Sequence, residues 1–367
     1  MNSVAPVVGL ASHLGRGVQR IVTDAAIGRL RSLPRTVDDL DAAYLSFVMG
    51  RNVTSMSVIG GDAGTSSRAR LSLTGDGVPD SVFVKMAAET AATRLMGEVG
   101  RLGETETRFY RELAPELTGL PASYGSAFDS LTGRYVLVLE DLPVDECEFP
   151  TTLKPISTDR AVKIVDLLAR LHATFWGRIP NWVYSASGDS SSLMVGALLK
   201  QSSRRIAERT DIDVARGRFI DENYRAVATV LDAMPNTVMH GDAHPGNVYF
   251  RNGDAGLLDW QAVRRGHPGR ELSYTLITSM TTAERQACQH DILDGYRDAL
   301  AAAGGPEIDR DELWQRYQQG AQYAYTAALI TAGMGGMQDE SIALEGLRRA
   351  VAALEDLDTV AVLKKSL

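Results

Sequence analysis

The length, composition and charge of the chain exclude several classes of protein. With 367 residues, 44% of them hydrophobic and 23% charged, the chain can bury a sizeable core and has an ordinary globular composition. Its only two cysteines, Cys147 and Cys288, exclude a disulfide framework, and a formal net charge of −8 argues against a nucleic-acid partner. The two isolated cysteines fit a reducing, cytoplasmic setting, and because no apolar run approaches the roughly 20 residues of a membrane span, we expect no stable membrane insertion.

The first segment is expected to be a helical extension with a basic character. It carries the arginines Arg16, Arg20, Arg29, Arg31 and Arg35. A basic helix of this kind can bind a membrane surface or a partner, but a solvated helical face is the commoner reason for such a pattern. The sequence leaves the role of this segment open.

Residues 55–86 are predicted to form a small antiparallel sheet. The β-type runs are residues 55–59, the stretch "RARLSLT" at 68–74 and "SVFVKM" at 81–86. A Gly-rich turn at residues 60–67 is expected between the first two runs. Its amides and hydroxyls could contact phosphates, although it matches no complete Gly-rich motif.

One helix and one buried strand are predicted next. In "GRLGETETRFYREL" the residues Leu102, Thr105, Phe109 and Leu113 recur at helical spacing, and Pro115 is expected to end the helix. The continuous apolar run in "RYVLVLEDL" is typical of a buried strand.

After Pro143 the pattern changes to helices. "AVKIVDLLARLHATFW" carries one apolar stripe, formed by Ile164, Leu167, Leu168, Leu171 and Phe175. Residues 190–232 and 284–362 are also helix-like, and a short β segment at 238–258 lies between them.

These elements predict an α+β fold with two lobes. Residues 1–141 are expected to form a β-rich N-terminal lobe, and residues 142–367 a mainly helical C-terminal lobe.

The stretch "HGDAHPGNVYFRNGDAGLLDWQ" gathers polar groups around a predicted β-hairpin. Residues 248–250 and 256–258 are short β-type runs joined by an Asn-Gly pair, which favours a tight turn. With Gly253 as the centre of the turn, Asn247 and Asp259 are predicted to face each other at the open end of the hairpin. An amide oxygen and a carboxylate are hard ligands that suit Mg²⁺.

The same stretch has the spacing of a phosphoryl-transfer loop. Asp242 precedes Asn247 by five residues, as in H-R-D-x-x-x-x-N, where the aspartate accepts the proton of the substrate hydroxyl and the asparagine holds a metal. Asp259 follows in the position of the second metal-binding aspartate, although Trp260 and Gln261 replace the usual Phe-Gly. Each residue alone could merely satisfy a turn, but the ordered set favours catalysis.

Two residues of the N-terminal lobe extend this pattern. Lys85 lies on a predicted strand, where a phosphate-binding lysine would project, and Glu106 on the next predicted helix could pair with it. Each could also be an ordinary solvated residue. Their order ahead of the segment that begins at His240 favours the functional interpretation.

These motifs resemble the aminoglycoside phosphotransferase and choline kinase-like family of small-molecule kinases, which has a protein-kinase-like fold. "HGDAHPGN" and "LLDWQ" resemble the catalytic and metal-binding segments of that family. "ETRFYREL", "VLVLEDL" and "LARLHATFW" are similar to its ecdysteroid kinase-like and choline kinase-like branch, so the resemblance covers residues from about 55 to about 280.

The resemblance implies ATP, or alternatively GTP, and Mg²⁺ as cofactors, with a role for each matching residue. The implied roles are Asp242 as catalytic base, Asn247 and Asp259 as Mg²⁺ ligands, Lys85 as ligand of the α- and β-phosphates, Glu106 as its partner, and the backbone from Glu140 to Leu142 as the adenine-binding hinge. Where the family usually has an aspartate in "P-x-x-D-L", this chain has Glu271 in "PGRELSY".

The sequence therefore predicts an ATP-dependent phosphotransferase that moves the γ-phosphoryl group to a hydroxyl of a small organic molecule. An aminoglycoside, an amino alcohol, a sterol-like alcohol and another metabolite all remain open as acceptors. One alternative is a metal-dependent hydrolase that uses His240, Asp242, His244 and Asp259. Another is a catalytically inactive nucleotide-binding regulator.

The acceptor pocket is expected in the helical lobe. Candidates for an apolar wall of this pocket are Tyr323, Tyr325, Met334 and Met337, although core packing would also explain each of them. The sequence leaves the oligomeric state open.

Overall fold

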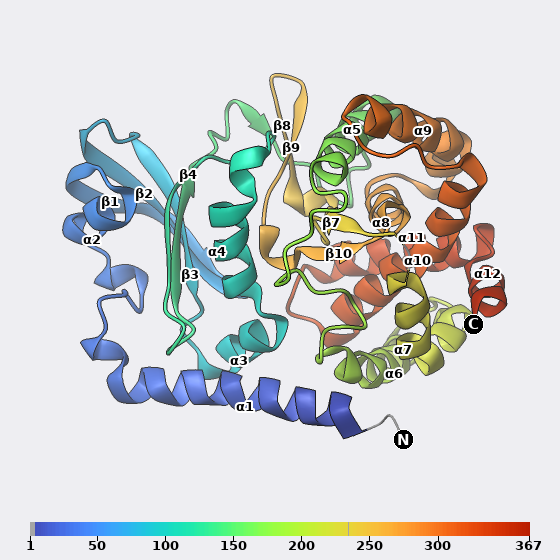
Figure 1. The fold of residues 1–367 in the computed structure, drawn as a ribbon, viewed down its shortest axis with the longest axis horizontal. Helices are drawn as coiled ribbons and strands as arrows, with labels where there is room; N and C mark the ends of the chain where they lie inside the picture. The colour runs from blue at the N-terminus through green and yellow to red at the C-terminus, as the bar shows by residue number, and fades with distance from the viewer. Residues whose placement is uncertain (1–3, 234) are drawn as a thin grey trace. The chain divides into compact units, whose positions relative to one another are not determined.

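The computed structural model describes residues 4–233 and 235–367 and divides into two compact units (Figure 1). The first unit comprises Met1–Cys147 and Asp259–Ala262, and the second comprises Glu148–Leu258 and Val263–Leu367. No helix in the described ranges is long and apolar enough to cross a membrane.

A five-stranded antiparallel sheet forms the body of the first unit. Its strand order is β1-β2-β3-β5-β4. The strands are β1 (Asn52–Ala63), β2 (Ser66–Asp76), β3 (Ser81–Ala87), β4 (Ser123–Phe128) and β5 (Tyr135–Glu140). The sheet confirms the predicted strands but corrects the turn between the first two. Residues 60–63 belong to β1 and pair with β2, with Gly61 opposite Ala69, so the predicted Gly-rich turn at 60–67 is largely strand.

Helices in the first unit lie before and between the strands. They are α1 (Val4–Ile27), α2 (Ala42–Met49), α3 (Ala91–Gly100) and α4 (Leu102–Glu112), with the 3-10 helices η1 (Gly28–Leu30), η2 (Val37–Asp39), η3 (Ala114–Glu116) and η6 (Trp260–Ala262). The helix predicted from Leu102 onward is α4, which ends ahead of Pro115 and contacts β4 and β5 along the sheet (Figure 1).

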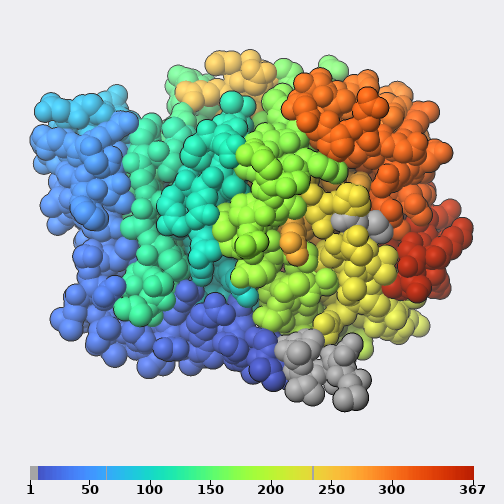
Figure 2. Space-filling model, in the orientation of Figure 1, coloured from blue at the N-terminus to red at the C-terminus, as the bar shows by residue number. Residues whose placement is uncertain are grey.

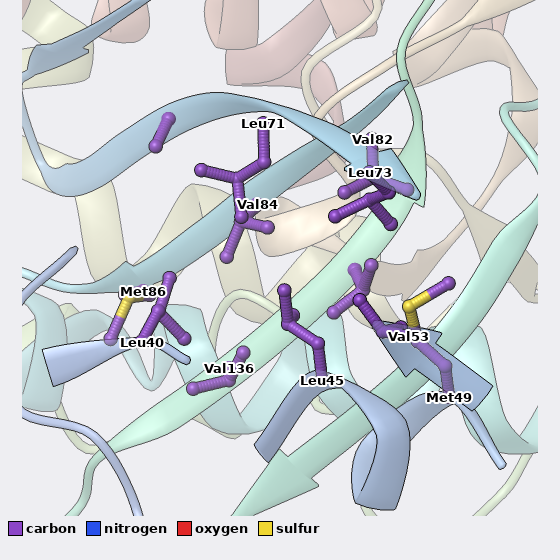
Figure 3. Close-up of a cluster of buried hydrophobic side chains, with 12 residues drawn as sticks. Leu40, Leu45, Met49, Val53, Leu71, Leu73, Val82, Val84, Met86 and Val136 are labelled. Atoms are coloured by element: carbon purple, nitrogen blue, oxygen red, sulfur yellow. The ribbon is translucent and has the colours of Figure 1, made fainter. Parts of the chain in front are cut away.

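An apolar cluster on one face of the sheet forms the core of the first unit (Figure 3). In β3 the alternate residues Val82, Val84 and Met86 point into this cluster, and so Lys85 points to the opposite face. The other members come from the segment before α2, from α2 itself and from β1, β2 and β5: Leu40, Leu45, Met49, Val53, Ala69, Leu71, Leu73, Val136 and Val138.

The second unit is mainly helical, as predicted. Its helices are α5 (Thr158–Thr174), α6 (Ser192–Arg209), η4 (Val214–Gly217), α7 (Arg218–Asp232), α8 (Pro268–Ser279), α9 (Thr282–Ala302), α10 (Arg310–Met334), α11 (Glu340–Asp356) and α12 (Thr359–Ser366). Helix α10 contacts α6, α8, α9, α11 and α12. Helix α9 forms part of the surface drawn in orange in Figure 2. The sequence patterns did not predict α8.

Short strands frame the polar stretch of the second unit. They are β7 (Thr237–Met239), β8 (Val248–Arg251), β9 (Asp254–Leu257) and β10 (Arg264–Gly266), which pairs with β7. The 3-10 helix η5 (Pro245–Asn247) precedes β8, and β6 (Cys147–Glu148) lies at the unit boundary in the chain.

The β8–β9 hairpin confirms the predicted turn but corrects its register. Asn252 and Gly253 both have positive φ, +53° and +83°, so the symmetric centre of the turn falls between them rather than on Gly253. Asn247 therefore lies opposite Leu258, whose amide donates to the Asn247 carbonyl at 2.8 Å. The predicted cross-strand pairing of Asn247 with Asp259 is wrong by one residue.

Candidate active site

The buried ring of His240 organises the loop that carries Asp242. Its Nδ1 accepts a hydrogen bond from the Asp242 amide at 3.1 Å, and its Nε2 lies 2.8 Å from the carbonyl oxygen of Leu258. A ring nitrogen that accepts from an N–H carries no proton, so Nε2 is the donor. With both nitrogens engaged by the backbone, His240 is a loop support and is not available to a metal.

The Asp242 carboxylate is held by two other side chains. Its Oδ1 accepts a hydrogen bond from the Tyr274 hydroxyl at 2.7 Å, and its Oδ2 accepts one from Asn247 Nδ2 at 3.2 Å. The side chain of Asp242 is 30% exposed. The carboxylate is therefore oriented from within the unit and still accessible to a ligand.

Asn247 and His244 complete the loop. Asn247 is 8% exposed, and its Nδ2 also donates to the Asp242 carbonyl at 3.0 Å, which leaves the amide oxygen as the group that faces away from Asp242. His244 caps η5, because its Nδ1 accepts from the Gly246 amide at 3.0 Å. Its Nε2 lies 3.8 Å from Asp242 Oδ2.

Glu271 on α8 supports the backbone of this loop through hydrogen bonds. Its Oε1 accepts from the Gly241 amide at 2.6 Å, and its Oε2 accepts from the His240 amide at 3.1 Å and lies 2.8 Å from His172 Nε2. Burial alone would raise the pKa of Glu271, but His172, the nearby His240 and the Gly241 amide hold it below its ordinary value. The longer side chain thus fills the place where the family pattern has an aspartate.

Two tyrosines that contact the loop were not assigned there from the sequence. Tyr274 lies three residues after Glu271 on α8 and binds Asp242. Tyr323, expected only as a pocket wall, donates its hydroxyl to the Gly241 carbonyl, and its ring lies 5.0 Å from that of Tyr274. Tyr325 is fully buried and its hydroxyl donates to the Val214 carbonyl at 3.2 Å, so it is a core residue.

In the first unit, one lysine lies between two carboxylates. Lys85 Nζ is 2.7 Å from Glu106 Oε2 and 2.7 Å from Asp259 Oδ1. Lys85 and Glu106 are only 4% and 1% exposed. The structure therefore brings together the predicted Lys85–Glu106 pair and adds Asp259 to it.

Burial and charge act against each other in this cluster. Burial would lower the pKa of Lys85, but the charges of Asp259 and Glu106 raise it above its ordinary value. Burial raises the pKa of Glu106 to about 7, and Lys85 opposes that rise. Two carboxylates share one ammonium, so the cluster carries a net negative charge that suits a metal cation when both carboxylates are ionised.

The segment that begins at Asp259 is fixed to α4. Trp260 stacks on Phe109 of α4, with ring centroids 4.0 Å apart and an interplanar angle of 7°. Asp259 itself has φ of +60°, a left-handed conformation that is uncommon for a residue other than glycine. Trp260 thus provides an aromatic anchor where the kinase pattern has phenylalanine.

The predicted adenine-binding hinge follows β5. The Glu140 amide donates to the Ala122 carbonyl at 2.8 Å, and Glu140 Oε2 accepts from the Ala122 amide at 3.1 Å. Asp141 forms a bidentate pair with Arg70, at 2.8 and 3.0 Å. The hinge role of Glu140 and Leu142 stays a prediction.

Comparisons with known proteins show the family and the fold that the chain resembles. The family described as "Phosphotransferase enzyme family" matches residues 62–314, more than half of the chain. A search of curated proteins found no significant match.

Solved structures of kinases resemble the chain at low identity. A choline kinase from Cryptosporidium parvum is 9% identical over 85% of this chain and 91% of its own, with a TM-score of 0.54. A choline/ethanolamine kinase family protein from Mesorhizobium loti is 12% identical over 94% of this chain and 98% of its own, with a TM-score of 0.49. The likeness to the Cryptosporidium structure confirms the predicted α+β fold class and shows the fold alone.

Proposed function

Because the chain belongs to the phosphotransferase enzyme family, we propose that it transfers the γ-phosphoryl group of ATP to a hydroxyl of a small organic molecule. The family confirms the predicted enzyme class, a phosphotransferase. The acceptor, the nucleotide and the residue roles are proposals. The observation that carries them is the accessible Asp242 carboxylate, held by Tyr274 and Asn247 in a loop with phosphoryl-transfer spacing.

Asp242 is proposed as the catalytic base. As the acceptor oxygen attacks the γ-phosphorus, its proton passes to Asp242, and the bond between the γ-phosphorus and the β–γ bridging oxygen breaks to release ADP. Tyr274 and Asn247 keep the carboxylate in one orientation, and so the enzyme does not have to order it during the reaction.

The first unit is proposed to hold the nucleotide. Lys85 would bind the α- and β-phosphates, Glu106 would keep its ammonium in place, and the backbone from Glu140 to Leu142 would receive the adenine. These roles correspond to a nucleotide-binding lobe at residues 1–141 and a catalytic and acceptor-binding lobe at residues 142–367. ATP as donor fits a cytoplasmic enzyme, and GTP remains an alternative donor.

Asn247 and Asp259 are proposed to hold Mg²⁺. The Asn247 Nδ2 donates hydrogen bonds to Asp242, so the Asn247 Oδ1 is the atom that can bind a cation. Asp259 supplies a carboxylate beside Lys85. Within the described part of the chain, no three His, Cys, Asp or Glu side chains form a metal cage. This donor set fits Mg²⁺, which usually takes one or two protein oxygens together with phosphates and water. When bound, the ion would neutralise phosphate charge.

The structure disfavours the hydrolase alternative, because both ring nitrogens of His240 form hydrogen bonds with the backbone and neither is left for a metal.

The proposed branch of the family is the ecdysteroid kinase-like branch. The similarity of "ETRFYREL", "VLVLEDL" and "LARLHATFW" to segments of that branch supports this placement.

Transfer can be tested with purified protein, Mg²⁺, ATP and a panel of hydroxylated compounds, with ADP release as the readout. Asp242→Ala should lower the turnover by at least about 100-fold while binding Mg·ATP with an affinity within about threefold of the wild type. The matched control is Asp298→Ala, which changes an exposed aspartate of α9 and should leave both values unchanged. Failure of the wild type to bind Mg·ATP would refute the kinase proposal; full activity of Asp242→Ala would refute the base assignment alone.

A further inference from the structure

Arg270 is a buried cation beside the Asp242 loop, and the part of the chain that the structure describes supplies no counter-ion within ion-pair distance. It lies in the first turn of α8, is 9% exposed, and its Nε is buried without a hydrogen-bond partner. Among residues 4–233 and 235–367, the guanidinium forms no hydrogen bond or ion pair, and Cζ lies 4.1 Å above the Tyr323 ring. An unpaired buried charge is unfavourable, and a cation near a helix N-terminus adds to this.

The position of Arg270 relates it to the catalytic base. Tyr323, on which its guanidinium stacks, donates to the Gly241 carbonyl and packs against Tyr274, which binds Asp242. Burial raises the pKa of the Tyr323 hydroxyl to about 12; the charge of Arg270 opposes this rise and that of Asp242 adds to it. Arg270 and Asp242 therefore both contact the same pair of packed tyrosines, Arg270 at the Tyr323 ring and Asp242 at the Tyr274 hydroxyl.

Other charged groups in this neighbourhood already have partners. Arg264 lies 3.7 Å from Asp189, and Asp232 accepts a hydrogen bond from the Ser187 amide at 2.5 Å. Within the described part of the chain, neither carboxylate forms an ion pair or a hydrogen bond with the Arg270 guanidinium.

Tyr224 on α7 adds a neutral hydroxyl to the same place. Burial raises the pKa of this hydroxyl above its ordinary value, and the charges of Arg270 and Arg264 oppose the rise without abolishing it. The hydroxyl therefore stays protonated at neutral pH and can donate a hydrogen bond.

We propose that Arg270 binds an anionic group of the phosphate acceptor, so that the acceptor is a hydroxylated organic anion, a carboxylate or a phosphate ester. This inference rests on the proposed function. A guanidinium presents parallel N–H groups that match a carboxylate or phosphate in a bidentate manner, and the Tyr224 hydroxyl nearby is a further hydrogen-bond donor. An amino sugar or a choline-like acceptor would instead bring a second positive charge next to an unpaired arginine.

Matched pairs of acceptors test this charge preference. Glycerate and glycerol 3-phosphate would be compared with glycerol, gluconate with glucitol, and choline and glucosamine would represent cations. We expect kcat/KM to be at least about tenfold higher for the anion of each pair. Arg270→Gln should abolish that preference. Arg270→Lys keeps the positive charge but loses the parallel N–H groups of the guanidinium, so it should retain part of the preference. Higher kcat/KM for neutral or cationic compounds would overturn the inference.

A binding measurement makes the test independent of the acceptor panel. Inorganic sulfate would be titrated calorimetrically into the Mg·ADP complex of the wild type, Arg270→Gln and Arg225→Gln, a matched change of an exposed arginine on α7. Sulfate should bind the wild type and Arg225→Gln equally and Arg270→Gln at least about tenfold more weakly. Equal binding to all three proteins, or no binding to any, would overturn the inference.

The same samples distinguish the proposed kinase function from the proposed anionic acceptor. If Mg·ADP fails to bind the wild type, the proposed function is refuted. If Mg·ADP binds and sulfate binding does not depend on Arg270, only the anionic acceptor is refuted. Thermal unfolding of each variant checks its fold, and Arg270→Lys preserves the comparison should Arg270→Gln unfold.

Discussion

The candidate residues of the first unit and those of the second unit, the two halves of the proposed site, differ in how their charges are balanced. In the first unit Lys85, Glu106 and Asp259 neutralise one another directly, with a surplus of carboxylate. In the second unit the Asp242 loop is held by hydrogen bonds from neutral groups and by the buried Glu271. Ion pairs can exchange partners when a charged ligand arrives, whereas a hydrogen-bonded frame fixes a geometry. The first half is therefore built to bind and the second to orient.

Replacing Lys85, the cation between Glu106 and Asp259, should have the largest effect on activity and nucleotide binding. In Lys85→Met the buried Glu106 and the partly exposed Asp259 lose their common partner and repel each other, so we expect kcat/KM to fall by at least about 100-fold and Mg·ATP affinity by at least about tenfold. Steady-state kinetics and calorimetry measure both. Lys200→Met, which changes an exposed lysine of α6, is the control. Unchanged nucleotide affinity would show that the pair is only structural.

Removing the charge of Glu271 should loosen the second half. Glu271→Gln replaces one of two accepting oxygens with a donor that faces N–H groups, so we expect a loss of about 2–4 kcal/mol in the free energy of unfolding. Since the folded pKa of Glu271 lies below its ordinary 4.5, this difference should be complete at neutral pH and disappear as the pH falls through the folded pKa.

Urea unfolding at several pH values measures the Glu271 effect. Glu208→Gln on α6, an exposed position, should have no effect at any pH. A deficit in Glu271→Gln that does not depend on pH would argue against a charged Glu271.

His267 should make the second half sensitive to acid. It caps α8 by accepting from the Gly269 amide at 3.1 Å, and burial lowers its pKa from 6.5 to about 3. Below pH 6.5 His267 binds a proton in the unfolded chain but not in the folded state, so the free energy of unfolding decreases as the pH falls. His267→Asn keeps a capping side chain and removes this titration.

The free energy of unfolding can be measured with urea at about pH 7 and about pH 5. Between these two values the wild type should lose about 2 kcal/mol more of it than His267→Asn. Equal losses in the two proteins would mean that His267 titrates normally in the fold.

Removing the tyrosine hydroxyl at Asp242 should have the smallest effect. Tyr274→Phe keeps the ring and deletes the 2.7 Å hydrogen bond to Oδ1, so we expect kcat to fall by about tenfold or less with KM for Mg·ATP unchanged. Tyr296→Phe, which removes a buried hydroxyl bonded to His172, controls for stability loss. A kcat equal to that of the wild type would show that Asn247 alone orients the base.

Local spacing predicted what lies close in sequence. The Asp242–Asn247 step, the Asn252-Gly253 turn and the α4 periodicity all depend on a few neighbouring residues, and each was found. The one-residue error in hairpin register arose because the turn centre was assigned to one residue rather than two.

Contacts that depend on tertiary packing could not be predicted in the same way. Neither Asp259 as a partner of Lys85 nor His172 as a partner of Glu271 has a signal in nearby residues. Tyr274 did have one: it follows Glu271 by three residues, and residues three apart share a helix face. A helix assigned at 268–279 would have directed both side chains to the loop.

The hydrogen bonds of the Asp242 loop also determine how long it stays closed. The backbone N–H groups of His240, Gly241, Asp242, His244, Gly246 and Asn247 are all donated within the unit. Amide hydrogens bound in this way exchange with solvent only when the segment opens. The loop that carries the proposed base should therefore exchange as slowly as the core helices around it, and the entropy of positioning Asp242 is then lost during folding rather than in each turnover.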